Sequence, residues 1–138
     1  MYNTFKAELT SYLNTNWSDT PIYDFANSPG EPPKYDPWIG AFKPIAIDDG
    51  VSSVAQGPCC ILSMYLIEIP VFVGSAEGVD LAVELTDKLK LLFLGKTLPG
   101  NISFLDLNTE FGTMSNGESS GAWYESRVSI TCEHRWAL

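Results

Sequence analysis

The apolar stretch from Ile61 to Val73 places the strongest constraint on how this chain can fold. Both parities of a strand over these residues are largely apolar, so both faces should be covered and the strand should lie inside a sheet. Pro70 cannot donate a hydrogen bond to a neighbouring strand, which predicts a bulge or a strand end near it. The stretch therefore predicts a long central strand.

From Gly78 to Leu94 the apolar period changes from two residues to 3.6, which predicts an amphipathic helix. Gly95 suits the left-handed position just after a helix. The apolar arc is unusually wide; it comprises Val79, Leu81, Ala82, Val83, Leu85, Leu89, Leu92 and Phe93. Part of this arc, together with Leu91 in the polar sector, is a candidate for burial against a neighbouring subunit.

The other expected elements frame this strand and helix. In chain order they are a helix over residues 2 to 14, a short strand from Pro21 to Phe25, a strand from Trp38 to Ile47, a turn at Asp48–Gly50, an optional return strand from Val51 to Val54, a strand from Ile102 to Leu107, and a closing strand from Trp123 to Arg135. The closing strand alternates between apolar and polar residues, so one of its faces should be buried and the other wet. Together these elements predict a single α+β domain over residues 1–138, with an antiparallel or mixed sheet and both helices on one face.

Two segments are expected to be long loops. Residues 27–37 are rich in proline, and residues 108–121 are rich in glycine, serine and asparagine. Long loops in compact domains are often functional, so we interpret both as contact arms. We also expect residues 108–121 to be mobile in the free protein and to become ordered in an assembly.

Composition limits the partners that this chain can bind. The net charge is −9, and no Lys or Arg occurs between Lys43 and Lys88. This charge distribution strongly disfavours tight binding to nucleic acid through its phosphates, although an acidic surface could let DNA pass without binding it. We expect no signal peptide and no membrane segment, and three cysteines without an export signal favour a reducing cytoplasm.

The sequence contains few groups suited to catalysis. His134 is the single histidine, and it can be combined with Cys59, Cys60 and Cys132 into a zinc site on paper. Adjacent cysteines on a strand point to opposite faces, so burial as small apolar residues explains the cysteines better. The glycines from Gly74 to Gly78 lack the residues of a phosphate-binding loop. We predict no enzyme activity, no cofactor and no metal.

Three parts of the chain resemble the tail terminator (tail completion) proteins of long-tailed bacteriophages. They are the amphipathic helix from Tyr2 to Leu13, the passage from strand to helix between Ile67 and Leu89, and the ending from Gly121 to Ile130, which opens with Ala-Trp-Tyr and carries Val-Ser-Ile. The proline-rich insertion at residues 27–37 departs from the plain form of the family and affects how neighbours contact that edge.

The resemblance implies a structural virion protein rather than an enzyme. It implies a homo-oligomeric ring, expected to be hexameric, that caps the tail tube, stops tube polymerisation and joins the tube to the neck of the head. Its partners would be other copies of itself, the tail tube protein and a neck or head-tail connector protein, with DNA passing through the lumen. It would reside in the virion tail, and in the host cytoplasm during assembly.

Two alternatives are another head-tail joining component and a small cytoplasmic ligand-binding or enzymatic domain. The residues expected to contact another subunit, the tube or the neck are Trp38, Phe42, Leu91, Glu110, Phe111 and Trp123.

Overall fold

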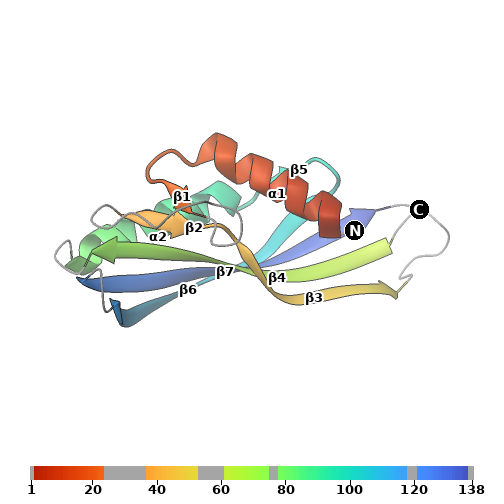
Figure 1. Ribbon diagram of the computed structural model, residues 1–138. Coiled ribbons are helices and arrows are strands. Elements are labelled where there is room, and N and C mark those ends of the chain that lie inside the picture. The colour runs from red at the N-terminus through yellow and green to blue at the C-terminus, as the bar shows by residue number, and fades with distance from the viewer. Residues whose placement is uncertain (1, 24–36, 53–60, 75–77, 118–120, 137–138) are drawn as a thin grey trace.

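The computed structural model describes residues 2–23, 37–52, 61–74, 78–117 and 121–136. In chain order the elements are α1 (Tyr2–Asn16), β1 (Ile22–Tyr23), β2 (Trp38–Gly40), β3 (Lys43–Ser52), β4 (Ile61–Gly74), α2 (Gly78–Phe93), β5 (Thr97–Leu98), β6 (Ile102–Gly117) and β7 (Gly121–Trp136). The predicted α+β class is confirmed, with two helices and one mixed sheet (Figure 1).

Strand β4 lies inside the sheet, as its apolar pattern predicts. It pairs along its whole length with β7, and on its other side with β2 and β3. The order across the sheet is β1-β2-β4-β7-β6-β5, with β3 also paired to β4. The β1–β2 pair is parallel and the remaining pairs are antiparallel.

The break expected near Pro70 occurs in the neighbours of β4 and not in β4 itself. Strand β3 pairs with β4 up to Glu68, and β2 takes over at Val71. Pro70 therefore falls between the two partners, where its missing N–H costs no ladder bond. The single strand expected from Trp38 to Ile47 is consequently two strands, β2 and β3.

The turn predicted at Asp48–Gly50 is wrong. These residues lie within β3, whose pairing with β4 continues to Ser52 opposite Leu62. A register shift between Asp48 and Ser52 accommodates the turn-like sequence inside the strand, as β-bulges do. Val51 belongs to the same strand, so the return strand predicted to begin there is also wrong.

The loop predicted at residues 108–121 is wrong as well. Residues up to Gly117 extend β6, and β7 begins at Gly121. The polar residues of this segment have low strand propensity, but antiparallel pairing with β7 keeps them in β6 as far as Gly117. A register shift between Glu110 and Thr113 interrupts this pairing once. The other predicted loop, at residues 27–37, lies outside the described residues except for Pro37.

Both helices pack on the same face of the sheet, which we call the helix face (Figure 1). The ring of Phe5 in α1 stacks on Tyr65 of β4 at a centroid distance of 4.3 Å. Tyr12 links α1 to α2, because its hydroxyl donates a hydrogen bond to the Leu92 carbonyl and its ring lies 5.7 Å from that of Phe93. The buried strand residues of the helix face are Ser63, Tyr65, Ile67, Ile69, Val71 and Val73 of β4 with Ser126, Val128, Ile130, Cys132 and His134 of β7.

Candidate interaction surface

Neither described helix covers the opposite side of the sheet, which we call the open face (Figure 1). Alternation along β4 places the residues Leu62, Met64, Leu66, Glu68, Pro70 and Phe72 on this side. Glu68 and Pro70 are buried, but the four large apolar residues are only half-buried. The prediction that both faces of β4 are covered is therefore fulfilled for the helix face and only in part for the open face.

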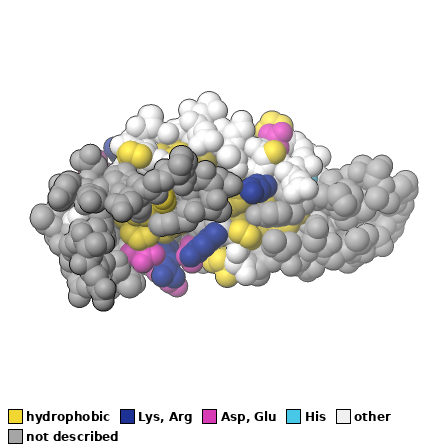
Figure 2. All heavy atoms as spheres, viewed as in Figure 1, with side chains coloured by type: hydrophobic (Ala, Val, Ile, Leu, Met, Phe, Trp, Pro, Cys, Tyr) yellow, Lys and Arg dark blue, Asp and Glu magenta, His cyan; other side chains and the backbone are white. Residues whose placement is uncertain are grey.

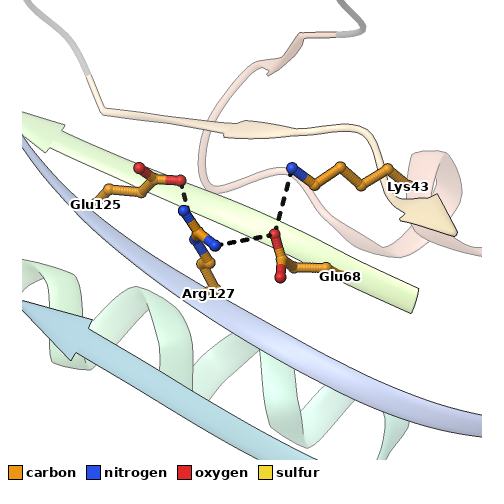
Figure 3. Close-up of polar contacts among 4 residues, drawn as sticks. All are labelled: Lys43, Glu68, Glu125 and Arg127. Carbon is orange, nitrogen blue, oxygen red and sulfur yellow. Dashed lines mark hydrogen bonds and ion pairs between the residues drawn. The ribbon is translucent and has the colours of Figure 1, made fainter. Parts of the chain in front are cut away.

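Four charged side chains form a cluster on the open face (Figure 3). Glu68 Oε1 lies 3.4 Å from Lys43 Nζ and 3.7 Å from an Arg127 guanidinium nitrogen. Arg127 Nε also donates a hydrogen bond of 3.2 Å to Glu125 Oε1. The strands bring these residues together because Lys43 is opposite Glu68 in the β3–β4 register, and Arg127 is opposite Pro70 in the β4–β7 register.

The cluster presents its cations outward and its anions inward. The side chains of Lys43 and Arg127 are 61% and 37% exposed, whereas those of Glu68 and Glu125 are 9% and 14% exposed. The carboxylates are thus largely withdrawn from water and held by the cations, which remain accessible. This arrangement can form hydrogen bonds to acidic groups of a partner.

The open face also carries exposed apolar side chains. Ile45 lies at the register shift of β3, and Leu105 at the first register shift of β6; both are about half exposed. Alternation places Ile45 on the side of Lys43, and Leu105 on the side opposite the buried Phe104. Hydrophobic side chains lie beside charged ones on the lower side of the molecule, away from α1 (Figure 2).

Helix α2 exposes a second set of apolar residues. Val79, Val83 and Leu91 of the helix and Leu94 just after it are exposed, whereas Ala82, Leu85, Leu89 and Phe93 are buried against the sheet and α1. The apolar arc of α2 is wider than the surface available to cover it, and its uncovered margin begins at Val79 and Val83. The part of the arc proposed for contact with another subunit is therefore exposed in the single chain.

The predicted contact residues are divided between the surface and the interior. Leu91 is 64% exposed, and Phe111 and Glu110 are also exposed on β6. Phe42 is half-buried, with its ring edge-on to Phe5 at 6.3 Å. Trp123 pairs with Gly74 through its backbone, and its side chain is outside the described part.

Trp38 offers almost no surface to a partner in this conformation. It is 3% exposed, and its ring stacks on Phe72 at a centroid distance of 4.1 Å. Trp38 therefore packs within its own chain, because the β2–β4 register places it directly opposite Phe72.

Sequence reasoning missed Ile45, Leu105 and the charged cluster. Glu68 interrupts an apolar strand, and a buried acid usually requires a cationic partner, so Glu68 was a usable signal. The identity of that partner depended on the strand register, which the sequence did not reveal.

The two described residues that were candidates for a zinc site lie in the interior. Cys132 and His134 are both buried on the helix face. Burial raises the pKa of the Cys132 thiol to about 12, so the nucleophilic thiolate is disfavoured at neutral pH. Cys59 and Cys60 lie outside the described residues, and within the described ranges no three His, Cys, Asp or Glu side chains are grouped as a metal site requires.

An open groove between α1 and the β5 region is lined by Glu8, Ser11, Tyr12, Thr15, Asn16, Leu98 and Pro99. It has one carboxylate and no partner for it among these residues, so it does not assemble an acid–base pair. Neither described helix is long and apolar enough to span a membrane.

No protein-family model matches the chain, and a search of curated proteins finds no relative that matches it.

Proposed function

We propose that this protein is a structural assembly subunit that forms a homo-oligomeric ring, expected to be hexameric, at the end of a long-tailed phage tail tube. In this role it ends tube polymerisation and provides the joining surface for the neck. Its action is mechanical, through complementary surfaces, and DNA passes through the lumen of the ring.

The observation that supports the proposal best is the pair of uncovered surfaces on opposite sides of the domain. The open face carries the charged cluster, with Ile45 near Lys43 on β3 and Leu105 further along the sheet on β6, and α2 carries Val79, Val83 and Leu91. Apolar side chains rimmed by polar ones are typical of protein–protein contact surfaces. A chain with two such surfaces can contact two neighbours at once, as a ring requires.

The proposal of a ring on a tail tube comes from the resemblance to tail terminator proteins, and the net charge of the chain is compatible with such a ring. A net charge of −9 disfavours binding to phosphates, which suits a lumen that DNA must cross without being held.

The direct test is to mix the purified protein with uncapped tail tubes from a long-tailed phage that lacks its terminator. We expect a ring at one end of each tube in negative-stain images, and no further growth of the tubes when tube subunits are added. Light scattering of the protein alone, measured in parallel, gives the mass of any ring that forms without a tube. Unrestricted tube growth with excess protein present, and no density at the tube end, would refute the proposal.

A further inference from the structure

We propose that the exposed margin of α2 in one copy docks onto the open face of the next copy, next to Lys43 and Ile45. This inference rests on the proposed function only in requiring that the chain assembles with copies of itself. It identifies which two surfaces meet and which charges pair.

The α2 side of the contact, which we call the α2 patch, consists of Val79, Asp80, Val83, Asp87 and Leu91. At about 100° per residue these positions occupy one continuous arc, and all five side chains are exposed. No ion pair among the described residues involves Asp80 or Asp87, whereas Glu84 is paired with Lys88. Lys90 lies on the same arc beyond Asp87, so the acidic part of the patch runs from Asp80 to Asp87.

The sheet side of the contact, which we call the sheet patch, consists of Lys43, Ile45, Met64 and Leu66. The acid that neutralises Lys43 is Glu68, which is buried beneath it, so the exposed end of the pair is the ammonium group. Across the sheet, the exposed Glu110 is the cross-strand neighbour of Arg127, and Asp48 and Glu133 are the cross-strand neighbours of Met64, so the positive charge of the sheet patch is confined to its Lys43 end.

The two patches are complementary in both respects that matter for docking. Each has exposed aliphatic side chains, and the α2 patch presents carboxylates where the sheet patch presents an ammonium group. They lie on opposite faces of the sheet, so one copy cannot satisfy both patches in a two-fold symmetric contact. A head-to-tail contact results, which gives a closed ring when the rotation between copies closes.

Pairing through sheet edges is a weaker alternative within the described residues. Strand β3, and β6 beyond its short pairing with β5, form the long edges of the sheet. Each contains two register shifts, at Pro44/Ala46 and Asp48/Ser52 in β3, and at Phe104/Asp106 and Glu110/Thr113 in β6. Bulges interrupt the regular row of donors and acceptors that an added strand needs. The faces are therefore better suited to docking than the edges.

The test uses two charge-changing variants at exposed positions. Asp87→Lys reverses an acid of the α2 patch, and Ile45→Glu places an acid in the sheet patch. Each single variant brings like charges together across the contact, so we expect self-association to weaken about tenfold or more. Lys6→Glu, at an exposed position of α1 outside both patches, is the control and should associate as the wild type does. Circular dichroism and thermal melts should show that all variants are folded.

Mixing the two variants distinguishes the head-to-tail contact from other arrangements. In an equimolar mixture, the new lysine of the Asp87→Lys variant would face the new glutamate of the Ile45→Glu variant, and the remaining contacts would be wild type. We therefore expect mass photometry, without tubes and on added tail tubes, to show assemblies restored in the mixture and reduced for each variant alone. A self-contact of α2 or of the open face would leave one single variant unaffected, and either that result or absence of rescue would overturn the inference.

Failure of this inference can be separated from failure of the proposed function. Wild-type rings that cap tubes, together with variants that assemble normally, would overturn the docking surfaces and leave the function intact. Assemblies that respond to the variants as expected but do not cap tubes would support the docking surfaces and refute the function. A wild-type protein that stays monomeric with and without tubes would overturn both.

Discussion

The two faces of β4 are formed by alternate residues of one strand, but their side chains are buried to different extents. On the helix face, Tyr65, Ile67 and Ile69 are fully covered by α1 and α2. On the open face, Leu66 and Met64 are only half covered, although they are similar in hydrophobicity. The difference shows that apolar residues on both faces of a strand predict burial of both faces. They do not show whether the same chain or another molecule provides the covering surface.

The largest expected effect comes from truncating neighbouring residues on the two faces. Ile67→Ala should lower the free energy of unfolding by about 2–5 kcal/mol, because it opens a cavity in a closed core. Leu66→Ala removes about as many methyl and methylene groups and should cost less than half as much, since water already reaches that side chain. Urea unfolding at low protein concentration measures both. Equal costs would show that the open face is covered in solution, by another copy or by other residues of the chain.

A second substitution tests whether the end of the open face near β2 is as tightly packed as the core. A Cβ atom added at Gly40 would lie 2.6 Å from Pro70 Cγ. Gly40→Ala should therefore destabilise the protein by about 1–3 kcal/mol, because the proline ring cannot move aside freely. In a Pro70→Ala background the same change should cost clearly less, as a double-mutant cycle would measure. An unchanged cost in that background would mean that Pro70 is not the obstacle.

A third comparison contrasts two arginines on β7 that point to the open face. Arg127→Ala leaves Glu68 with Lys43 as its remaining close cation, and should cost about 1–3 kcal/mol in thermal or urea unfolding. Arg135 pairs with Glu133 in the same way but is 62% exposed. Arg135→Ala should therefore cost less than about 0.5 kcal/mol. Similar costs for the two arginines would indicate that the withdrawal of Glu68 from water has no energetic consequence.

The fourth comparison uses the buried thiol of Cys132, whose reactivity reports how well the helix face is closed. Burial raises its pKa from 9.0 to about 12, so iodoacetamide should label it slowly at pH 8 and rapidly once urea unfolds the chain. Mass spectrometry of peptides separates this site from Cys59 and Cys60. Labelling of the folded protein at the rate of a free thiol would contradict the closed helix face.

The same raised pKa has a defined effect on stability against pH. Below about pH 9 the thiol is protonated in both the folded and the unfolded chain, so it contributes no pH dependence. As pH rises from 9 toward 12, the unfolded chain releases this proton and the folded chain retains it. Stability should therefore fall in that window, and Cys132→Ala should remove this part of the fall.

Local patterns were sufficient where one element determines its own structure. The long apolar run of β4, the 3.6-residue period of α2 and the alternation of β7 each predicted an element with nearly correct ends. Local sequence patterns gave wrong predictions where pairing with a neighbouring strand determined the structure. Residues 108–117 have the composition of a loop, yet β7 holds them in β6 through a continuous antiparallel ladder. For the same reason Asp48–Gly50 belongs to β3 and not to a turn.

The candidate surface was predictable in part. The excess width of the apolar arc of α2 and the exposure of Leu91 follow from helical geometry and the small number of elements available to cover it. Trp38 was expected to contact another subunit, the tube or the neck, but the β2–β4 register buries it against Phe72.

The sequence by itself determined an acidic α+β domain with a central strand, an amphipathic helix and more apolar surface than two helices can cover. Only the tertiary structure decided which surface stays uncovered and which charges meet on it. The reason is physical: periodicity is set by neighbours three or four residues apart, whereas the pairing of Lys43, Glu68 and Arg127 depends on strand register across three separate segments.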